Sequence, residues 1–448
     1  MSSALNRLGT LLVAAFILLT GHGLQLALVP LRAELSGWSV DWIGWIGTSY
    51  FAGFLLGCFT VPSVVSAVGH VRTFGVLTAV GAGSLLALAL IDSPWGWLLL
   101  RVASGWAISG LYLVMESWLN EMADGQRRGT VLSIYTVLVL VAIASGQQLL
   151  AAGDPLSTDM LVLGALFILL AAVPVGLTRA PVPQPLPAFR FSIGELFRAS
   201  RAATLATFCA GLITGAFWTL VPALLAKDGW SRGDTGTLLA ATIAGGALLQ
   251  LPLGRLSDRV DRRLVLAAMT TAGALVCGLL GGGAGADLWT ALLVMGLLGG
   301  CVMPVYSIAL AHANDNSSGD FLRIGTTMLL MNTLGSMSGP IAVTTLARST
   351  TGLDPDLAGY FVFSTGVFAV ATAIVLLMML LRRAPRAHFE AYELNTRSTQ
   401  GAFALDPRSD DDSTLTSTGV RSAPQRHPDA SRSPHLPPEP SPEPRPEP

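Results

Sequence analysis

Charged residues are scarce in this chain of 448 residues, where they make up only 12% of the sequence. A soluble globular protein carries about a quarter charged residues. Here 52% of the residues are hydrophobic and the net charge is −1. The composition therefore excludes an ordinary soluble domain and gives no reason to expect a nucleic-acid partner. We expect a protein of the lipid bilayer.

The motifs of nucleotide, metal and catalytic sites are also missing. Lys227 is the single lysine and follows no glycine-rich loop, so ATP is not expected to drive this chain directly. No HExxH, GxSxG or clustered Cys/His pattern occurs. The four cysteines stand singly in apolar stretches and are interpreted as packing residues. We therefore expect no enzyme, no metal and no cofactor.

Long apolar runs are abundant instead. A run of about 20 apolar residues is long enough to cross the hydrocarbon core of a bilayer. The stretch Leu11–Leu31 is such a run and carries no charge. Hydropathy predicts twelve spans, at residues 9–31, 41–62, 73–92, 96–119, 129–151, 159–178, 202–226, 235–254, 264–284, 287–311, 323–347 and 358–381.

The basic residues of the short loops predict the orientation. With the N-terminus inside, the outer loops hold only Arg32, Lys227, Arg232 and Arg348, while sixteen basic residues lie inside. Because basic residues remain on the cytoplasmic side, both termini are expected there. We expect a multi-pass protein of the bacterial cytoplasmic (inner) membrane.

The chain divides into four segments. Residues 1–178 and 202–382 each hold six expected spans, and the proline-rich linker 179–201 joins them on the cytoplasmic side. Residues 383–448 are polar and rich in proline, which predicts a disordered tail. A proline-rich ligand for a partner domain is the alternative interpretation of this tail.

The two halves are related by a repeat. Leu98–Tyr112 matches Leu292–Tyr306, which lies 194 positions later. Ser145–Gln147 matches Ser338–Pro340 at an offset of 193. Repeated six-span halves with a substrate site between them near the membrane midplane are typical of transporters.

A family resemblance rests on the stretch GRLSDRVDRR, which begins at Gly254 and holds six charged residues in ten. Its glycine, Asp-Arg pair and final basic pair resemble the loop signature of the major facilitator superfamily. Arg101 followed by Gly105 resembles the second motif of that family. The resemblance covers residues 9–382 and implies an all-α membrane protein with twelve transmembrane helices in two six-helix pseudo-symmetric halves. GHVR at Gly69–Arg72 and YLVMESWLN at Tyr112–Asn120 are similar to a bacterial subgroup of mostly unassigned substrates.

The charged loop has two interpretations. Gly254, Asp258, Arg259, Arg262 and Arg263 are predicted to form a cytoplasmic latch, which holds the outward-open state and breaks when the halves rock. The alternative is an anchor that only fixes topology, which needs the arginines but not Asp258.

Candidate substrate and proton groups lie inside the spans. Arg101 is the one basic residue well inside a span, where charge is costly, and it is predicted to contact an anion or to take part in proton coupling. Arg101, Gly105, Tyr112 and Glu116 share one face of a helix, which is typical of a cavity wall. Glu116 is a candidate proton carrier, or it pairs with the arginines at 127 and 128.

Other candidates come from the remaining central spans. His22 and Gln25 lie on the first span, Trp218 on the seventh and Tyr306 on the tenth. The histidine is a candidate for substrate or proton binding, and the aromatic rings for stacking on a ligand. Core packing is the alternative for each of them.

These observations predict a secondary active transporter of a small organic solute. Proton coupling is favoured, because titratable groups are present and no nucleotide site is. A mostly apolar cavity favours export of an amphipathic compound. Import of a sugar or organic acid, and a sensor with the fold of a transporter, are the alternatives.

Overall fold

The computed structural model describes residues 2–122, 128–177, 191–283, 287–316, 321–351 and 355–381. Helices account for nearly all of these residues. They are α1 (Ser2–Leu35), α2 (Val40–Val68), α3 (His70–Ala87), α4 (Pro94–Met122), α5 (Arg128–Gln148), the 3₁₀ turn η2 (Leu149–Ala152), α6 (Thr158–Leu170), α7 (Ala172–Leu177), α8 (Ile193–Ala199), α9 (Arg201–Lys227), α10 (Arg232–Ser257), α11 (Arg262–Gly281), α12 (Leu288–Asp315), α13 (Phe321–Thr351) and α14 (Leu357–Leu381).

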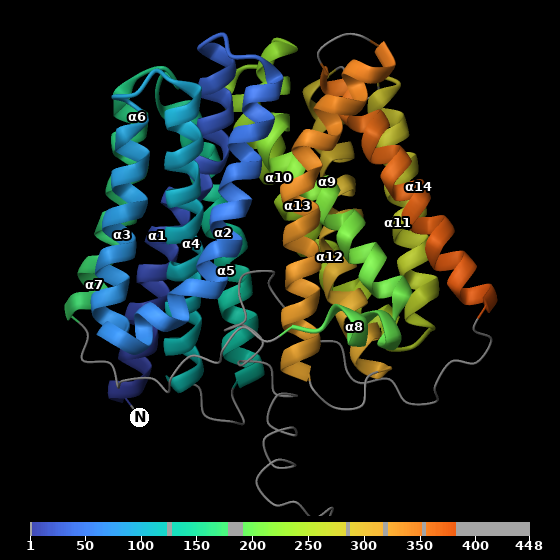
Figure 1. The fold of residues 1–448 in the computed structure, drawn as a ribbon, viewed down its shortest axis with the longest axis horizontal. Coiled ribbons are helices and arrows are strands. Elements are labelled where there is room, and N and C mark those ends of the chain that lie inside the picture. The colour runs from blue at the N-terminus through green and yellow to red at the C-terminus, as the bar shows by residue number, and fades with distance from the viewer. Residues whose placement is uncertain are drawn as a thin grey trace, which may run out of the picture.

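The long helices stand side by side in two groups. Helices α1 to α7 form a first half and α9 to α14 a second half (Figure 1). The N-terminus and α8 lie at the lower end of Figure 1, and the turn between α1 and α2 lies at the upper end. Helices α1 and α2 pack against α9, α2 also packs against α13, and α5 packs against α10. These four central pairs place the boundary between the halves along the middle of the bundle.

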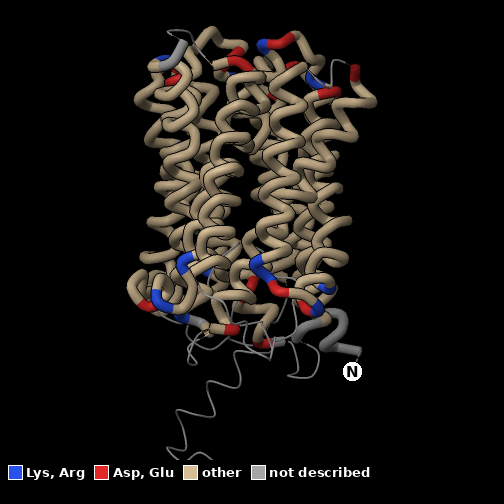
Figure 2. The backbone as a smooth tube through the Cα atoms, turned by 90° about the vertical axis from the view of Figure 1, so that its right-hand side faces the viewer, with Lys and Arg blue, Asp and Glu red and all other residues tan. Residues whose placement is uncertain are grey.

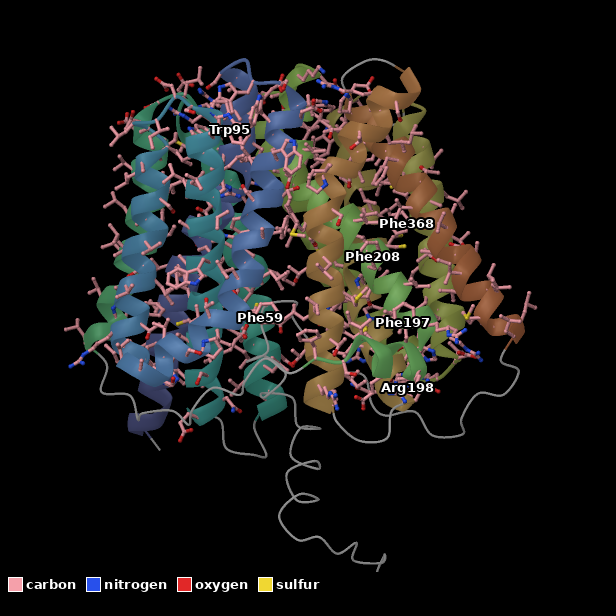
Figure 3. The ribbon with its side chains drawn as sticks, in the orientation of Figure 1. Phe59, Trp95, Phe197, Arg198, Phe208 and Phe368 are labelled. Atoms are coloured by element: carbon pink, nitrogen blue, oxygen red, sulfur yellow. The ribbon has the colours of Figure 1, made fainter. Side chains whose placement is uncertain are left out.

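The bundle has the properties of a membrane protein. Within the described residues, ten helical segments are long and apolar enough to cross a bilayer. The charged residues gather toward the two ends of the bundle (Figure 2). At the upper end, Trp42 packs edge-on against Trp95, with ring centroids 5.1 Å apart. Trp95 is exposed there, as is typical of an aromatic belt at a membrane surface, while Arg198 lies at the lower end (Figure 3).

The expected spans agree with the helices apart from several details. The expected spans 73–92 and 323–347 fall on α3 and α13, which lie along α4 and α9 but are not among the ten segments. Helix α3 ends at Ala87, earlier than expected. The sixth span is divided between α6 and α7, and Pro174 in α7 has no N–H to continue the hydrogen-bond ladder. The tail 383–448 and most of the linker 179–201 lie outside the described residues.

Glycines allow the helices beside the site to approach closely. A Cβ atom on Gly105 of α4 would overlap the carbonyl oxygen of Tyr50 on α2. In the second half, a Cβ on Gly299 of α12 would overlap the carbonyl oxygen of Thr242 on α10. Gly105 and Gly299 are matched by the sequence repeat, so both halves use the same kind of backbone contact. In the first half this contact fixes the height of Tyr50 relative to α4.

Candidate functional site

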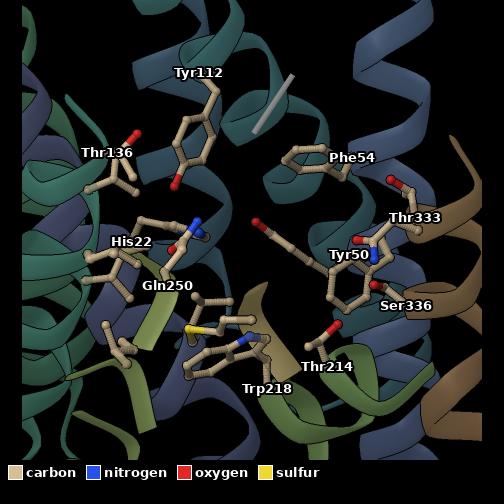
Figure 4. A pocket seen from close by; sticks show the side chains of 18 residues that line it. His22, Tyr50, Phe54, Tyr112, Thr136, Thr214, Trp218, Gln250, Thr333 and Ser336 are labelled. Atoms are coloured by element: carbon tan, nitrogen blue, oxygen red, sulfur yellow. The ribbon is translucent and has the colours of Figure 1, made fainter. Parts of the chain in front are cut away.

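A cavity of about 240 Å³ lies between the two halves. Helices α1, α2, α4 and α5 line one side and α9, α10, α12 and α13 the other. Its volume is close to the lower limit for small-molecule sites, which is about 300 Å³. Its walls combine aromatic rings with neutral hydrogen-bonding groups (Figure 4). Because both halves contribute, any rocking of one half against the other changes the shape of this space.

His22 forms the centre of the first-half wall. The Gln25 amide Nε2 lies 3.1 Å from His22 Nδ1, and the Gln25 oxygen Oε1 accepts a hydrogen bond of 3.3 Å from Ser104. Since an amide nitrogen can only donate, Nδ1 accepts and the proton of the neutral ring is on Nε2. The ring packs against Tyr50 and Tyr112, with centroids 6.2 and 6.1 Å away. Gln25 is fully buried and does not line the cavity, so it orients His22.

The second-half wall is built from Trp218 and a group of neutral polar side chains. Trp218 lines the cavity from α9. Gln250 of α10 donates to Ser307 over 3.3 Å, which holds its amide at the cavity wall. Asn332 of α13 donates to the carbonyl oxygen of Thr207 over 3.2 Å. Thr214, Thr333 and Ser336 complete this polar lining.

Arg101 lies beside the cavity. Its guanidinium carbon is 4.3 Å from the centroid of the Tyr50 ring, a cation–π geometry. Its side chain borders a narrow void of about 10 Å³ whose walls include Tyr50, Phe51 and Trp218, and these three residues also line the main cavity. Tyr50 therefore separates Arg101 from the main cavity.

Glu116 and Tyr306 are placed elsewhere. Glu116 is fully buried, does not line the cavity and is hydrogen-bonded to Tyr135 of α5. The side chains at 127 and 128, its expected partners, lie outside the described part of the chain. Tyr306 is fully buried in a cluster of apolar residues within the second half. The structure thus brings His22, Tyr112 and Trp218 together at the cavity, with Gln25 and Arg101 directly behind them.

Several wall residues were not predicted from the sequence. Tyr50 and Phe54 of α2 resembled the ordinary aromatic residues of an apolar span. Asn332, Thr333 and Ser336 did carry a signal, because their spacing puts three polar groups on one face of a helix.

The charged loop follows the C-terminal end of α10 (Ser257), at the lower end of the bundle. Arg262 is fully buried, and its Nε lies 2.7 Å from the carboxylate of Asp315 on α12. The same guanidinium lies 3.3 Å from Asp258 and 3.2 Å from the hydroxyl of Ser257. These contacts join α10, α11 and α12. Within this loop Arg259 is exposed, and the Gly254 carbonyl accepts a backbone hydrogen bond of 3.2 Å from Asp258.

Asp261 begins α11 as its N-cap. Its carboxylate accepts a bond of 2.9 Å from the backbone N–H of Arg263 and pairs with the Arg263 side chain at 2.7 Å. Partial burial raises the pKa of Asp261, but the hydrogen bonds and charge of Arg263 outweigh it, so that this pKa lies below its usual value.

Polar contacts between the halves lie above the cavity. Asp41 at the start of α2 pairs with Arg348 near the end of α13. Thr48 donates to the carbonyl oxygen of Met337 over 2.8 Å. On the other side of the bundle, Thr237 of α10 donates to Gln148 of α5 over 3.4 Å. These contacts hold the halves together at the upper end in this conformation.

Comparisons with known proteins agree with this architecture. The model of the Major Facilitator Superfamily matches residues 203–420. An uncharacterized MFS-type transporter, YcaD of Escherichia fergusonii, is 27% identical over 337 residues, which are 74% of this chain and 86% of that protein. A second MFS-type transporter, from Enterobacter sp., is 27% identical over 401 residues, covering 85% of this chain and 97% of the other. Among solved structures, the nucleoside transporter NupG aligns with a TM-score of 0.68 at 15% identity, over 84% of this chain and 99% of that one.

Proposed function

Because the chain is a membrane transporter of the major facilitator superfamily, we propose that it carries a small amphipathic organic solute by alternating access. The observation that supports this proposal is the cavity shared by both halves and covered above by contacts between them. Breaking those contacts and closing the lower end would expose the same site to the other side of the membrane. This is the movement that a repeated two-half transporter performs around a central site.

The lining supports an amphipathic solute. Among the described residues that line the cavity there is no aspartate, glutamate, lysine or arginine. Tyr50, Tyr112 and Trp218 offer apolar faces for stacking, whereas Gln250 and Asn332 offer amide groups for hydrogen bonding. A solute with an apolar body and a few polar substituents matches both kinds of surface.

Proton coupling and export complete the proposal. Among the described residues that line the cavity, His22 is the one whose side chain type ordinarily titrates near neutral pH, and it is the candidate proton site. The loop arginines favour cytoplasmic termini, in which case the upper end faces outward and this conformation is closed to the outside. The mostly apolar lining of the cavity favours export of an amphipathic compound. The alternative is import of a sugar or organic acid. Inward flux of such a substrate in reconstituted vesicles would support it.

A ligand screen tests the proposed site. A ligand at about a hundred times its dissociation constant adds about 2.7 kcal/mol to the stability of the purified protein, which raises its melting temperature. We expect amphipathic ligands to raise the melting temperature of the wild type but not that of Trp218→Ala. The rise should be retained in Trp289→Ala, the matched change at an exposed tryptophan. Ligands that bind both variants equally would place the site elsewhere.

Flux measurements separate the transporter from the sensor. In liposomes, a ligand found in the screen should move together with protons in the wild type, and His22→Gln should uncouple proton movement from solute movement. Removal of residues 383–448 should leave this flux intact. A chain that binds the ligand but moves none of it would favour the sensor.

A further inference from the structure

The guanidinium of Arg101 has no counter-charge within the described part of the chain. Its side chain is only 5% exposed, and its Nε and Nη1 atoms are buried without a hydrogen-bond partner. The described residues offer it no ion pair. Its close neighbour is the Tyr50 ring, which provides a π face but no hydrogen-bond acceptor for these nitrogens.

The nearest acidic group on the same helix is too far away to neutralise Arg101. Glu116 follows it by 15 positions, which is about 22 Å along a helix. At the upper end, Asp41 is paired with Arg348. A planar cation with free donors therefore lies just behind the wall of the ligand cavity.

Tyr50 occupies the position that an anion would take. Its ring covers the guanidinium, and its hydroxyl group points into the cavity (Figure 4). The void beside Arg101 is about 10 Å³, which is room for one water molecule at most. A carboxylate can reach Arg101 only if the Tyr50 ring turns aside and gives up its place.

We propose that the transported solute carries a carboxylate, and that Arg101 binds this group after the Tyr50 ring has moved away. The inference rests on the proposed function, because it places the solute in the same cavity. The fork of Nε–H and Nη–H donors matches the two oxygens of a carboxylate, which forms stronger hydrogen bonds with a guanidinium than a neutral group does. The apolar body of the solute then lies between Tyr112 and Trp218.

This arrangement also explains how an empty carrier tolerates the buried charge. Without solute, the cation–π contact with Tyr50 partly compensates the guanidinium. With solute, the carboxylate replaces the ring. A neutral solute would displace Tyr50 without supplying an acceptor of equal strength, and so it would bind more weakly than the corresponding acid.

Matched acid and amide probes test the proposal. The probes are benzoate and benzamide, 1-naphthoate and 1-naphthamide, and indole-3-acetate and indole-3-acetamide, added to the purified full-length chain. Binding is measured from the melting temperature at increasing probe concentration. We expect at least one acid to bind at least about tenfold more tightly than its amide.

Variants assign the preference to Arg101. Arg101→Gln should abolish the difference between acid and amide, and Arg101→Lys should retain part of it. Arg232→Gln, at an exposed arginine of the upper end, should keep the wild-type preference. Tyr50→Leu should tighten acid binding about three- to thirtyfold, because the competing ring is removed.

Three results would overturn the inference: equal binding of acids and amides, no binding of any acid, or an acid preference that survives in Arg101→Gln. Its failure is distinct from failure of the proposed function. If acids and amides bind equally and this binding is lost in Trp218→Ala, the cavity remains the binding site and only the preference for a carboxylate is refuted. Probes whose binding ignores Trp218 would remove the site itself.

Discussion

Among the buried arginines of the described residues, Arg262 and Arg101 have opposite surroundings. Arg262 is fully buried at the lower end of the second half, where Asp315 and Asp258 face its guanidinium at 2.7 and 3.3 Å. Arg101 is buried inside a span of the first half, where the described residues give it an aromatic ring and no acid. The difference teaches that burial alone does not assign a role to a charged side chain, because the role depends on which groups contact it.

The energetic cost of the two charges differs accordingly. A charge at the centre of a membrane span costs about 2.5–3.5 kcal/mol on insertion scales. Arg262 lies at the end of the bundle instead, where two carboxylates compensate its burial and it fastens α11 to α12. The Tyr50 ring compensates the charge of Arg101 only in part, and we infer that the full counter-charge comes from the solute.

The repeat deepens this contrast, because neither arginine has an arginine at the matching position. Met295 corresponds to Arg101, and the pair at 69 and 70 corresponds to Arg262 and Arg263. In the first half, His70 makes a neutral contact of 3.1 Å with Ser117 where the second half has ion pairs. The two halves therefore share a backbone arrangement, but their buried arginines lie at different, unmatched positions.

The largest effect is expected from removing the paired arginine. Arg262→Met removes the guanidinium that faces the carboxylate of Asp315, which should cost about 3–5 kcal/mol of stability. The measurement is the melting temperature of the purified protein, with Arg259→Met at an exposed position as control. A loss below about 1 kcal/mol would mean that Arg262 does not fasten the helices.

A second substitution tests how the region around Arg101 is held. Gly105→Ala places a methyl group against the carbonyl oxygen of Tyr50, so α2 and α4 must move apart. We expect a loss of about 1–3 kcal/mol. Gly83→Ala adds the same methyl group to open space and should be neutral. Equal melting temperatures of the two variants would contradict the tight contact.

Asp258 separates the two interpretations of the charged loop. Asp258→Asn leaves the bond between Arg262 and Asp315 in place, so stability should change by less than about 1 kcal/mol. If the loop is a latch, transport should slow about fivefold, which corresponds to about 1 kcal/mol in a barrier. Unchanged flux at normal abundance would favour the topological anchor.

The smallest effect is expected at the helix cap and depends on pH. The pKa of Asp261 is lowered in the folded protein, so its charge stabilises the fold above the unfolded pKa of about 3.9. This contribution is lost as the pH falls through the lower, folded-state pKa. Asp261→Asn should therefore melt below the wild type at pH 7, and the gap should narrow below about pH 4. A gap independent of pH would show that the charge is not involved.

The sequence predicted the fold in most respects because hydropathy is a local property. Ten expected spans correspond to helical segments able to cross a membrane, and the family resemblance agrees with the comparisons. The end of α3 at Ala87 was missed, since the apolar run of the sequence continues beyond the helix as far as Ile91. The site was predicted only in part, because side chains on different helices meet through packing that no single span encodes.

Arg101 and Tyr50 illustrate that limit. The sequence singled out Arg101 because its charge is unusual within a span. Nothing local marked Tyr50, and only the packing of α2 on α4 places its ring over the guanidinium. In the same way, Glu116 lies on the helix face of Tyr112 but remains behind the cavity wall.

The most direct test of the contrast between the arginines is the melting temperature of Arg101→Met without any ligand. Because the described residues give Arg101 no partner to be left unpaired, we predict that the variant is at least as stable as the wild type. A gain of about 1 kcal/mol is expected, as for other stabilising changes at functional sites. A fall comparable to that of Arg262→Met would contradict the contrast, because it would show that Arg101 is also held by the protein itself.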